Sequence, residues 1–117
     1  MEPIISDRGS HLEVLIGAGA LCEAGFVDLL VRARTRFGAK PILVVCDDPA
    51  AHVRLEDAYR IGIGISERLP RQRVAIALRG RKSAEAERFT ELVAANRGAE
   101  LRYFDDVPAA KAWLGVA

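Results

Sequence analysis

The sequence predicts an α/β domain with a mixed, mostly parallel five-stranded sheet and four helices, in the order β-β-α-β-α-β-α-β-α. Two observations predict it. Short apolar segments alternate along the chain with longer segments in which apolar residues recur at helical spacing. One short segment, 41–46, is continuously apolar and rich in β-branched residues, as in a parallel strand that is covered on both faces. Strands that alternate with helices in this way need crossover connections, which favour parallel pairing.

The first half of the chain is expected to form a hairpin, a helix, a strand and a second helix. Asp7-Arg-Gly-Ser10 has the composition of a turn between two apolar segments, which predicts the hairpin. Gly38 and Pro70 each follow a helical stripe of apolar residues and are expected to end the two helices. The expected elements are strands at 4–6 and 12–17, a helix at about 21–37, a strand at 41–46 and a helix at about 53–69.

The second half of the chain continues the alternation. The expected elements are a strand at 73–78, a helix from the N-cap Ser83 to Gly98, a strand at 101–104 and a closing helix that opens at Asp105-Asp-Val-Pro108. The side chains that the third helix is expected to bury are Phe89, Leu92 and Val93. Trp113 is expected to anchor the closing helix to the core.

The composition is that of an ordinary soluble domain. Half of the 117 residues are apolar, and no linker or low-complexity stretch divides them, so residues 1–117 are expected to form a single domain. A net charge of +1 gives no basic excess for nucleic acid, and no apolar run is long enough for a transmembrane segment. The N-terminus lacks the features of a signal peptide, and Cys22 and Cys46 form no Cys-x-x-Cys pair. We therefore expect a cytoplasmic protein with reduced cysteines.

Several short stretches of the second half resemble a known family. They are Arg68-Leu-Pro70, Arg73-Val-Ala-Ile-Ala77, Asn96-Arg-Gly98, Glu100-Leu-Arg-Tyr-Phe104 and Ala109-Ala-Lys-Ala-Trp-Leu114. Together with the order of the elements, these stretches resemble the SpoIIAA-like (STAS-like) family, which shares features with CRAL/TRIO-type lipid-binding domains. The resemblance is specific over roughly the last 50 residues and implies the fold, because the family as a whole has little assigned biochemistry.

The better-known relatives of that family are anti-sigma factor antagonists, which carry a phosphorylatable serine in an Asp-Ser-x-Gly motif. The corresponding stretch here reads Asp47-Asp48-Pro49-Ala50, and no serine or threonine occurs between Cys46 and Ser66. The sequence therefore predicts no phosphoryl switch at this place. A permanent mimic of the phosphorylated form is the alternative, although an aspartate imitates the charge of phosphoserine only crudely.

The glycines after the second strand do not complete a cofactor motif. Val14-Leu-Ile-Gly17-Ala-Gly19 resembles the start of a dinucleotide-binding fingerprint, but Cys22 stands where a third small residue is needed. Asp47, the acidic residue at the end of the next strand, comes 30 positions after Gly17, whereas the fingerprint needs about 20. We therefore expect no cofactor.

Polar residues follow two of the predicted parallel strands and should meet at the carboxyl edge of the sheet, where open α/β sheets bind ligands. The cations of one loop, with the helix start that follows them, could hold a phosphate or carboxylate. These residues are Arg79, Arg81, Lys82 and Ser83. A solvated loop in front of a capped helix is the simpler alternative.

The neighbouring loop supplies Asp47, Asp48 and His52. Two carboxylates and an imidazole could perform acid–base chemistry or bind a metal. In the simpler alternative, Asp48 caps a helix ahead of Pro49 and His52 lies on an exposed first turn. With no nucleophile motif elsewhere, we assign no catalytic residue and no metal ligand.

The helix at 53–69 is unusually apolar. Tyr59, Ile61 and Ile63 extend its apolar surface beyond one stripe, so the helix is either buried on several sides or faces a partner or an acyl chain. Gly62 and Gly64 within it are expected to permit close approach to the sheet, and they would also let the helix deform as a lid.

The sequence as a whole favours a non-enzymatic binding or regulatory module that acts through protein–protein contacts, as a homodimer or with another protein. The first alternative is binding of a small amphipathic or lipid-like anionic ligand, with its acyl part under the helix at 53–69 and its head group on Arg79, Arg81 and Lys82. The second alternative is an enzyme that uses Asp47, Asp48 and His52.

Overall fold

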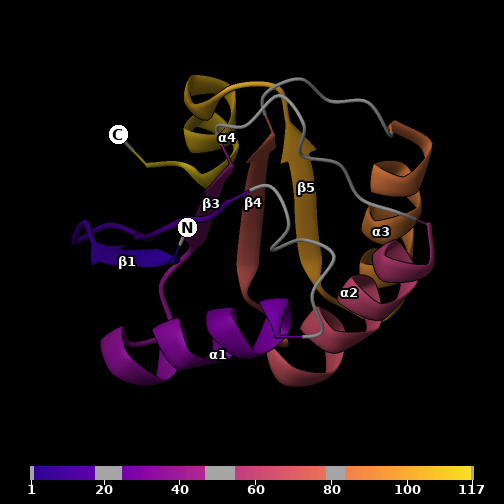
Figure 1. The fold of residues 1–117 in the computed structure, drawn as a ribbon, viewed down its shortest axis with the longest axis horizontal. Helices are drawn as coiled ribbons and strands as arrows, with labels where there is room; N and C mark the ends of the chain where they lie inside the picture. Colours follow the sequence, from indigo (N-terminus) through magenta and orange to yellow (C-terminus); the bar gives the residue numbers. More distant parts are fainter. Residues whose placement is uncertain (1, 18–24, 47–54, 79–83, 117) are drawn as a thin grey trace.

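The computed structural model describes residues 2–17, 25–46, 55–78 and 84–116. They form a compact α/β arrangement of five strands and four helices in the predicted order, so the predicted class and element order are confirmed (Figure 1). The elements are β1 (Ile4–Asp7), β2 (Leu12–Leu15), α1 (Phe26–Phe37), β3 (Ile42–Cys46), α2 (Leu55–Arg68), β4 (Arg73–Leu78), α3 (Ala84–Asn96), β5 (Glu100–Phe104) and α4 (Val107–Leu114). The predicted beginnings of the first two helices lie outside the described residues.

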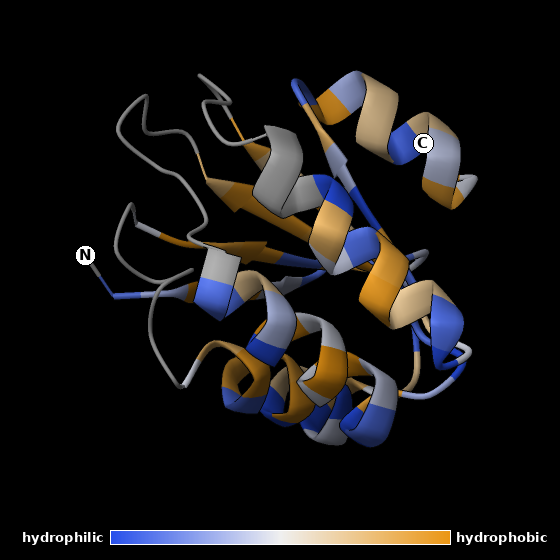
Figure 2. Ribbon diagram, turned by 90° about the vertical axis from the view of Figure 1, so that its right-hand side faces the viewer, coloured by the Kyte–Doolittle hydropathy of each residue, from blue (hydrophilic) through white to orange (hydrophobic). Residues whose placement is uncertain are grey.

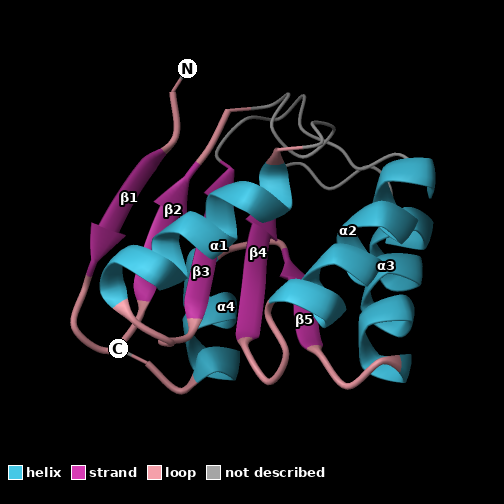
Figure 3. Cartoon of the chain, turned by 90° about the horizontal axis from the view of Figure 1, so that it is seen from below, coloured by secondary structure: helices cyan, strands magenta, loops and turns pink. Residues whose placement is uncertain are grey.

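The strands of the mixed sheet lie in chain order, β1-β2-β3-β4-β5. β1 pairs with β2 in the antiparallel sense, and the pairs β2–β3, β3–β4 and β4–β5 are parallel. Because successive crossovers share one hand, consecutive order places their helices on one face of a sheet. Figures 1 and 3 show this arrangement: α1, α2 and α3 cover one face and α4 covers the other.

The sheet separates two apolar cores. Alternate residues of a strand point to opposite faces, so Ile42 and Val44 contribute to the larger core beneath α1–α3, and Leu43 to the smaller core beneath α4. Ala110 and Leu114 of α4 complete the smaller core. No helix in the described ranges is both long and apolar enough to cross a membrane.

The glycines of α2 face the neighbouring helices. A Cβ added to Gly62 would lie 2.9 Å from Val93 Cγ1 of α3, and one added to Gly64 would lie 2.9 Å from Val27 Cγ2 of α1. Real Cβ atoms almost never come so close to another heavy atom. The expectation that these glycines serve contact with the sheet is therefore wrong, because they let α2 fit between two helices. A helix wedged in this way is a poor candidate for a lid.

The closing helix α4 begins as the sequence predicts. Asp106 is its N-cap, and its Oδ1 accepts a hydrogen bond of 2.8 Å from the backbone N–H of Ala109. The half-buried Trp113 packs against Phe104, with ring centroids 5.7 Å apart, and the guanidinium of Arg73 lies 4.3 Å from the Trp113 ring centroid. Trp113 thus anchors α4 to β4 and β5.

Replacing Gly62 with alanine should destabilise the protein. Overpacking typically costs about 1–3 kcal/mol, whereas the better helix propensity of alanine returns about 1 kcal/mol. We expect a net loss of about 1 kcal/mol in the free energy of unfolding, measured by urea denaturation. In a Val93→Ala background the same change should cost less, because the nearest methyl group, Val93 Cγ1, is gone, while the contacts with the Cβ of residue 93 and with Thr90 O remain. An equal loss of unfolding free energy in both backgrounds would contradict the close packing of Gly62 against Val93.

Candidate functional site

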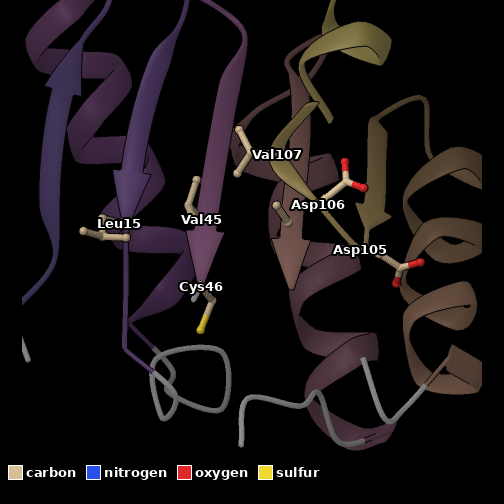
Figure 4. A pocket seen from close by; sticks show the side chains of 7 residues that line it. Leu15, Val45, Cys46, Asp105, Asp106 and Val107 are labelled. Carbon is tan, nitrogen blue, oxygen red and sulfur yellow. The ribbon is translucent and has the colours of Figure 1, made fainter. Parts of the chain in front are cut away.

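A pocket of about 440 Å³ lies at the carboxyl edge of the sheet, on the face that α4 covers (Figure 4). Its lining residues come from the ends of β2, β3 and β4 and from the β5–α4 connection. They are Leu15, Val45, Cys46, Ala77, Asp105, Asp106 and Val107. This is the edge at which open α/β sheets generally bind ligands.

The register of the sheet brings the apolar lining together. Leu15 is the partner of Val45 across the β2–β3 pair, and Val45 is the partner of Ala77 across the β3–β4 pair. Residues paired in this way share one face of a sheet, so the three side chains form a continuous apolar floor. Val107, in the first turn of α4, lies beside that floor.

The polar groups of the pocket stand on two sides of it. Figure 4 shows the Asp105 and Asp106 carboxylates on the β5 side and the Cys46 thiol at the end of β3. The Asp106 carboxylate already serves as the helix cap. Among the described residues, no group of three His, Cys, Asp or Glu side chains is arranged to hold a metal ion. The described part of the pocket is therefore suited to binding the apolar part of a ligand.

Most of the predicted site residues lie outside the described part of the chain. They are Asp47, Asp48, His52, Arg79, Arg81, Lys82 and Ser83. In the sequence, Asp47 directly follows Cys46 of the pocket, and Arg79 directly follows the last residue of β4. The alternatives of an anion site and of an acid–base group therefore stay untested, as does the expectation that the stretch with Gly19 and Cys22 forms no dinucleotide-binding fingerprint.

The predicted residues of α2 occupy different environments. Tyr59 is 51% exposed, and its ring stacks on Phe89 of α3 with centroids 6.2 Å apart. Ile63, one turn later, is half-buried. Ile61 is only 2% exposed and belongs to the larger core, so the expectation that it contributes to a binding surface is corrected. It points to the sheet because it shares the buried stripe of Ala58 and Ile65.

The exposure of Leu92 corrects a second expectation. Leu92 was predicted to lie in the core with Phe89 and Val93, but it is 57% exposed. The face of α3 that packs inward instead carries the fully buried Thr90 and Ala94, whose small side chains allow α2 to approach closely. Leu92 lies two residues after Thr90, and side chains two residues apart on a helix point to nearly opposite sides.

Four exposed or half-buried apolar residues of the two helices are treated together as the α2–α3 patch. It consists of Tyr59, Ile63, Phe89 and Leu92. Figure 2, in which α3 faces the viewer, shows that apolar and polar turns alternate along this side of the molecule. Monomeric proteins usually scatter exposed apolar residues singly. The stacked pair of Tyr59 and Phe89, with Ile63 and Leu92 near it along the same two helices, therefore merits a functional explanation.

Sequence analysis did not single out Asp57, a buried carboxylate in the first turn of α2. Its side chain is almost fully buried and forms an ion pair with Arg60. The helical periodicity could have identified it, because Asp57 lies four residues before Ile61 and therefore on the buried side of the helix. A buried carboxylate is usually paired, and this pairing gives Asp57 a structural role in starting α2.

Asp7 and His11, near the β1–β2 turn and away from the pocket, have shifted pKa values. The pKa of Asp7 is lowered because its carboxylate accepts hydrogen bonds from Lys40 Nζ (2.8 Å) and from the backbone N–H of Gly9 (2.9 Å). The pKa of His11 is lowered chiefly because burial penalises its charged form, and the charge of Lys111 adds to this effect. His11 Nε2 has no hydrogen-bond partner in the described structure.

Comparisons with family models, with curated proteins and with solved structures gave no match to this chain.

Lowering the pH through the ordinary histidine pKa, about 6.5, should destabilise the protein through His11. The folded-state pKa lies below that of the unfolded chain, so the unfolded chain binds more protons below pH 6.5 and stability falls as the pH falls. Urea denaturation at pH 7.5 and pH 5.5 checks this expectation. His11→Leu should show a smaller fall between these values, and an unchanged fall would contradict the assignment to His11.

Proposed function

We propose that this chain is a non-enzymatic binding module that acts through protein–protein contacts made by the α2–α3 patch. The observation that carries the proposal is the exposure of Tyr59 and Leu92 on adjacent helices, on either side of the half-buried Phe89. The apolar second helix was expected to be buried on several sides, or to face a partner or an acyl chain. Exposed apolar area on the outside of α2 supports the partner.

The composition of the patch suits the centre of an interface. Binding energy in interfaces concentrates in a few residues, among which tyrosine is enriched, and charged residues form the rim. Here the exposed Glu56, Arg60 and Arg88 are near neighbours of the patch residues in the sequence of α2 and α3. A standard interface buries about 800 Å² on each partner, so the four patch residues would form only its core.

The rigidity of the patch also supports binding. Gly62 and Gly64 hold α2 against α3 and α1, and the Tyr59 ring is held by stacking on Phe89. A surface that is already ordered before binding loses little conformational entropy on association. The two helices therefore present their apolar residues at low entropic cost.

The resemblance to the SpoIIAA-like family agrees with a regulatory role of this kind. The family's known antagonists act on partner proteins, but the serine that controls them is replaced here by the Asp47-Asp48-Pro49-Ala50 stretch. We therefore propose binding without a phosphoryl switch at that place.

Placing a photo-crosslinking amino acid at Leu92 tests this proposal. In native cells we expect a crosslinked adduct from position 92 and none from the exposed Arg97, which directly follows the last residue of α3. Adding Tyr59→Ser should reduce the adduct at least fivefold, because a central aromatic residue commonly contributes about 1–2 kcal/mol to binding. The mass of the adduct distinguishes a second copy from another protein.

The stability of the crosslinking variants serves as a control. Both positions are exposed, so substitutions there should change the free energy of unfolding by no more than about 0.5 kcal/mol. Equal adducts from positions 92 and 97, or none from either, would contradict the proposal.

The carboxyl-edge pocket favours a second candidate, binding of a small amphipathic ligand. Its apolar floor of Leu15, Val45 and Ala77 and its volume of about 440 Å³ suit the apolar part of such a ligand. In this second candidate the acyl part would lie on the α4 face, whereas the notably apolar side of α2 belongs to the packed larger core. The expected head-group contacts lie in residues 79–82, outside the described residues.

Native mass spectrometry of the purified protein, repeated after denaturation, tests the second candidate. We expect an extra mass that is lost on unfolding. Leu15→Trp should abolish it because the indole covers the apolar floor that the ligand would contact, whereas Ile4→Trp, at the cross-strand neighbour outside the pocket, should retain it. A wild-type protein without extra mass, or an extra mass that survives Leu15→Trp, argues against this pocket.

A further inference from the structure

The outer edge of β1 carries backbone groups that no described residue satisfies. The N–H of Arg8 donates to the C=O of His11 at 2.9 Å, so this pair is hydrogen-bonded. Hydrogen-bonded and non-hydrogen-bonded pairs alternate along an antiparallel ladder, so Ile5 and Asp7 direct their N–H and C=O groups away from β2. β1 pairs only with β2 in the sheet. An open edge of this kind is a template for another strand.

A groove of about 470 Å³ lies beside this edge, between β1 and α1. It is lined by Glu2, Pro3, Ile5, Leu29, Arg32 and Arg36. Neither arginine forms an ion pair with a residue that the structure describes. The Arg36 guanidinium lies over the Phe37 ring, 4.9 Å from its centroid, a contact that leaves N–H groups for an acceptor. The groove therefore combines three apolar side chains with two cations and one carboxylate, Glu2, which leaves a net positive charge.

The two arginines are spaced to match a strand. α1 returns the chain between the parallel strands β2 and β3, so it runs opposite to them and in the same general direction as β1, as Figures 1 and 3 show. Residues four apart on a helix are separated by about 6 Å. Alternate residues of a strand, which share one face, are separated by about 6.7 Å. Alternate side chains of an added strand can thus reach Arg32 and Arg36 together.

We propose that the β1 edge binds an extended acidic peptide segment of a partner protein by adding it to the sheet. Alternate acidic side chains face Arg32 and Arg36, and the intervening apolar side chains lie beside Ile4, which is 54% exposed on the opposite face of the sheet. Main-chain pairing to Ile5 and Asp7 supplies the remaining contacts, as in other complexes formed by strand addition. This site lies on different elements from the α2–α3 patch and extends the proposed function to a second surface.

A second copy of this chain fits the edge less well than an acidic peptide. Pairing β1 with its copy through the outward groups of Ile5 and Asp7 would place Pro3, Ile5 and Asp7 of the copy on the arginine side. Of these only Asp7 is acidic, and it already forms an ion pair with Lys40. The copy would therefore leave both arginines without a free carboxylate.

Fluorescence anisotropy with a labelled peptide, Thr-Val-Glu-Val-Glu-Val-Glu-Val-Thr, tests the proposal. We expect saturable binding that weakens about fivefold or more with Arg32→Glu and with Arg36→Glu, and that weakens as salt rises. Arg97→Glu changes the net charge equally but lies after α3, so binding should stay within about twofold. Circular dichroism confirms that each variant is folded.

Two further probes separate strand addition from other modes of binding. A peptide N-methylated at the alternate amides that would pair with β1 should not bind, because strand addition needs those donors. A peptide with lysine in place of glutamate should bind at least fivefold more weakly. The proposal is overturned if the acidic peptide does not bind, if the N-methylated peptide binds equally, if Arg97→Glu weakens binding as much as Arg32→Glu, or if sedimentation shows that β1 pairs with a second copy.

Discussion

The approach of α2 to its two neighbours is the constraint on which the rest of the structure depends. In a sheet of consecutive order, each crossover helix is displaced from the previous one by a single strand, about 4.8 Å, whereas helix axes pack about 8–10 Å apart. Three helices on one face are therefore crowded. Gly62 and Gly64 relieve the crowding on the two sides of the middle helix, and α3 lies beside β5 at the edge of the sheet (Figure 1).

The two edges of the sheet differ in whether a helix covers them. α3 covers the edge at β5, where the Glu91 carboxylate accepts a hydrogen bond of 3.1 Å from the backbone N–H of Tyr103. The edge at β1 has no such cover among the described residues, because α4 lies over β3–β5 on the other face and α1 leaves a groove beside Ile5. α3, which carries the exposed Leu92, contacts β5, so the apolar patch and the open edge at β1 lie toward opposite ends of the sheet.

The sequence predicted the helices and strands better than the burial and tertiary contacts of their residues. Periodicity identified every strand and helix in order, because period 2 and period 3.6 are local properties of the chain. It could not show that Thr90 and Ala94, and not Leu92, face inward, since that depends on how closely α2 approaches. Gly62 and Gly64 stand out in the sequence because glycine is unfavourable inside a helix. Their proximity to Val93 and Val27 depends on how the helices pack, which the local sequence does not determine. The carboxyl edge was expected from a general rule for α/β sheets, whereas its apolar floor depends on the register of three strands.

The sheet separates the carboxyl-edge pocket from the other two proposed binding surfaces, and this separation determines whether binding at one affects binding at another. The pocket lies on the α4 face, whereas the α2–α3 patch and the arginine groove lie on the other face. Between pocket and patch stands β4, whose Ala77 lines the pocket and whose Ile76 and Leu78 are fully buried in the larger core. A tightly packed interior transmits small displacements poorly unless an element has two stable arrangements. The wedge of α2 between α1 and α3 opposes a second arrangement, so occupation of the pocket, the patch and the β1 edge should be thermodynamically independent.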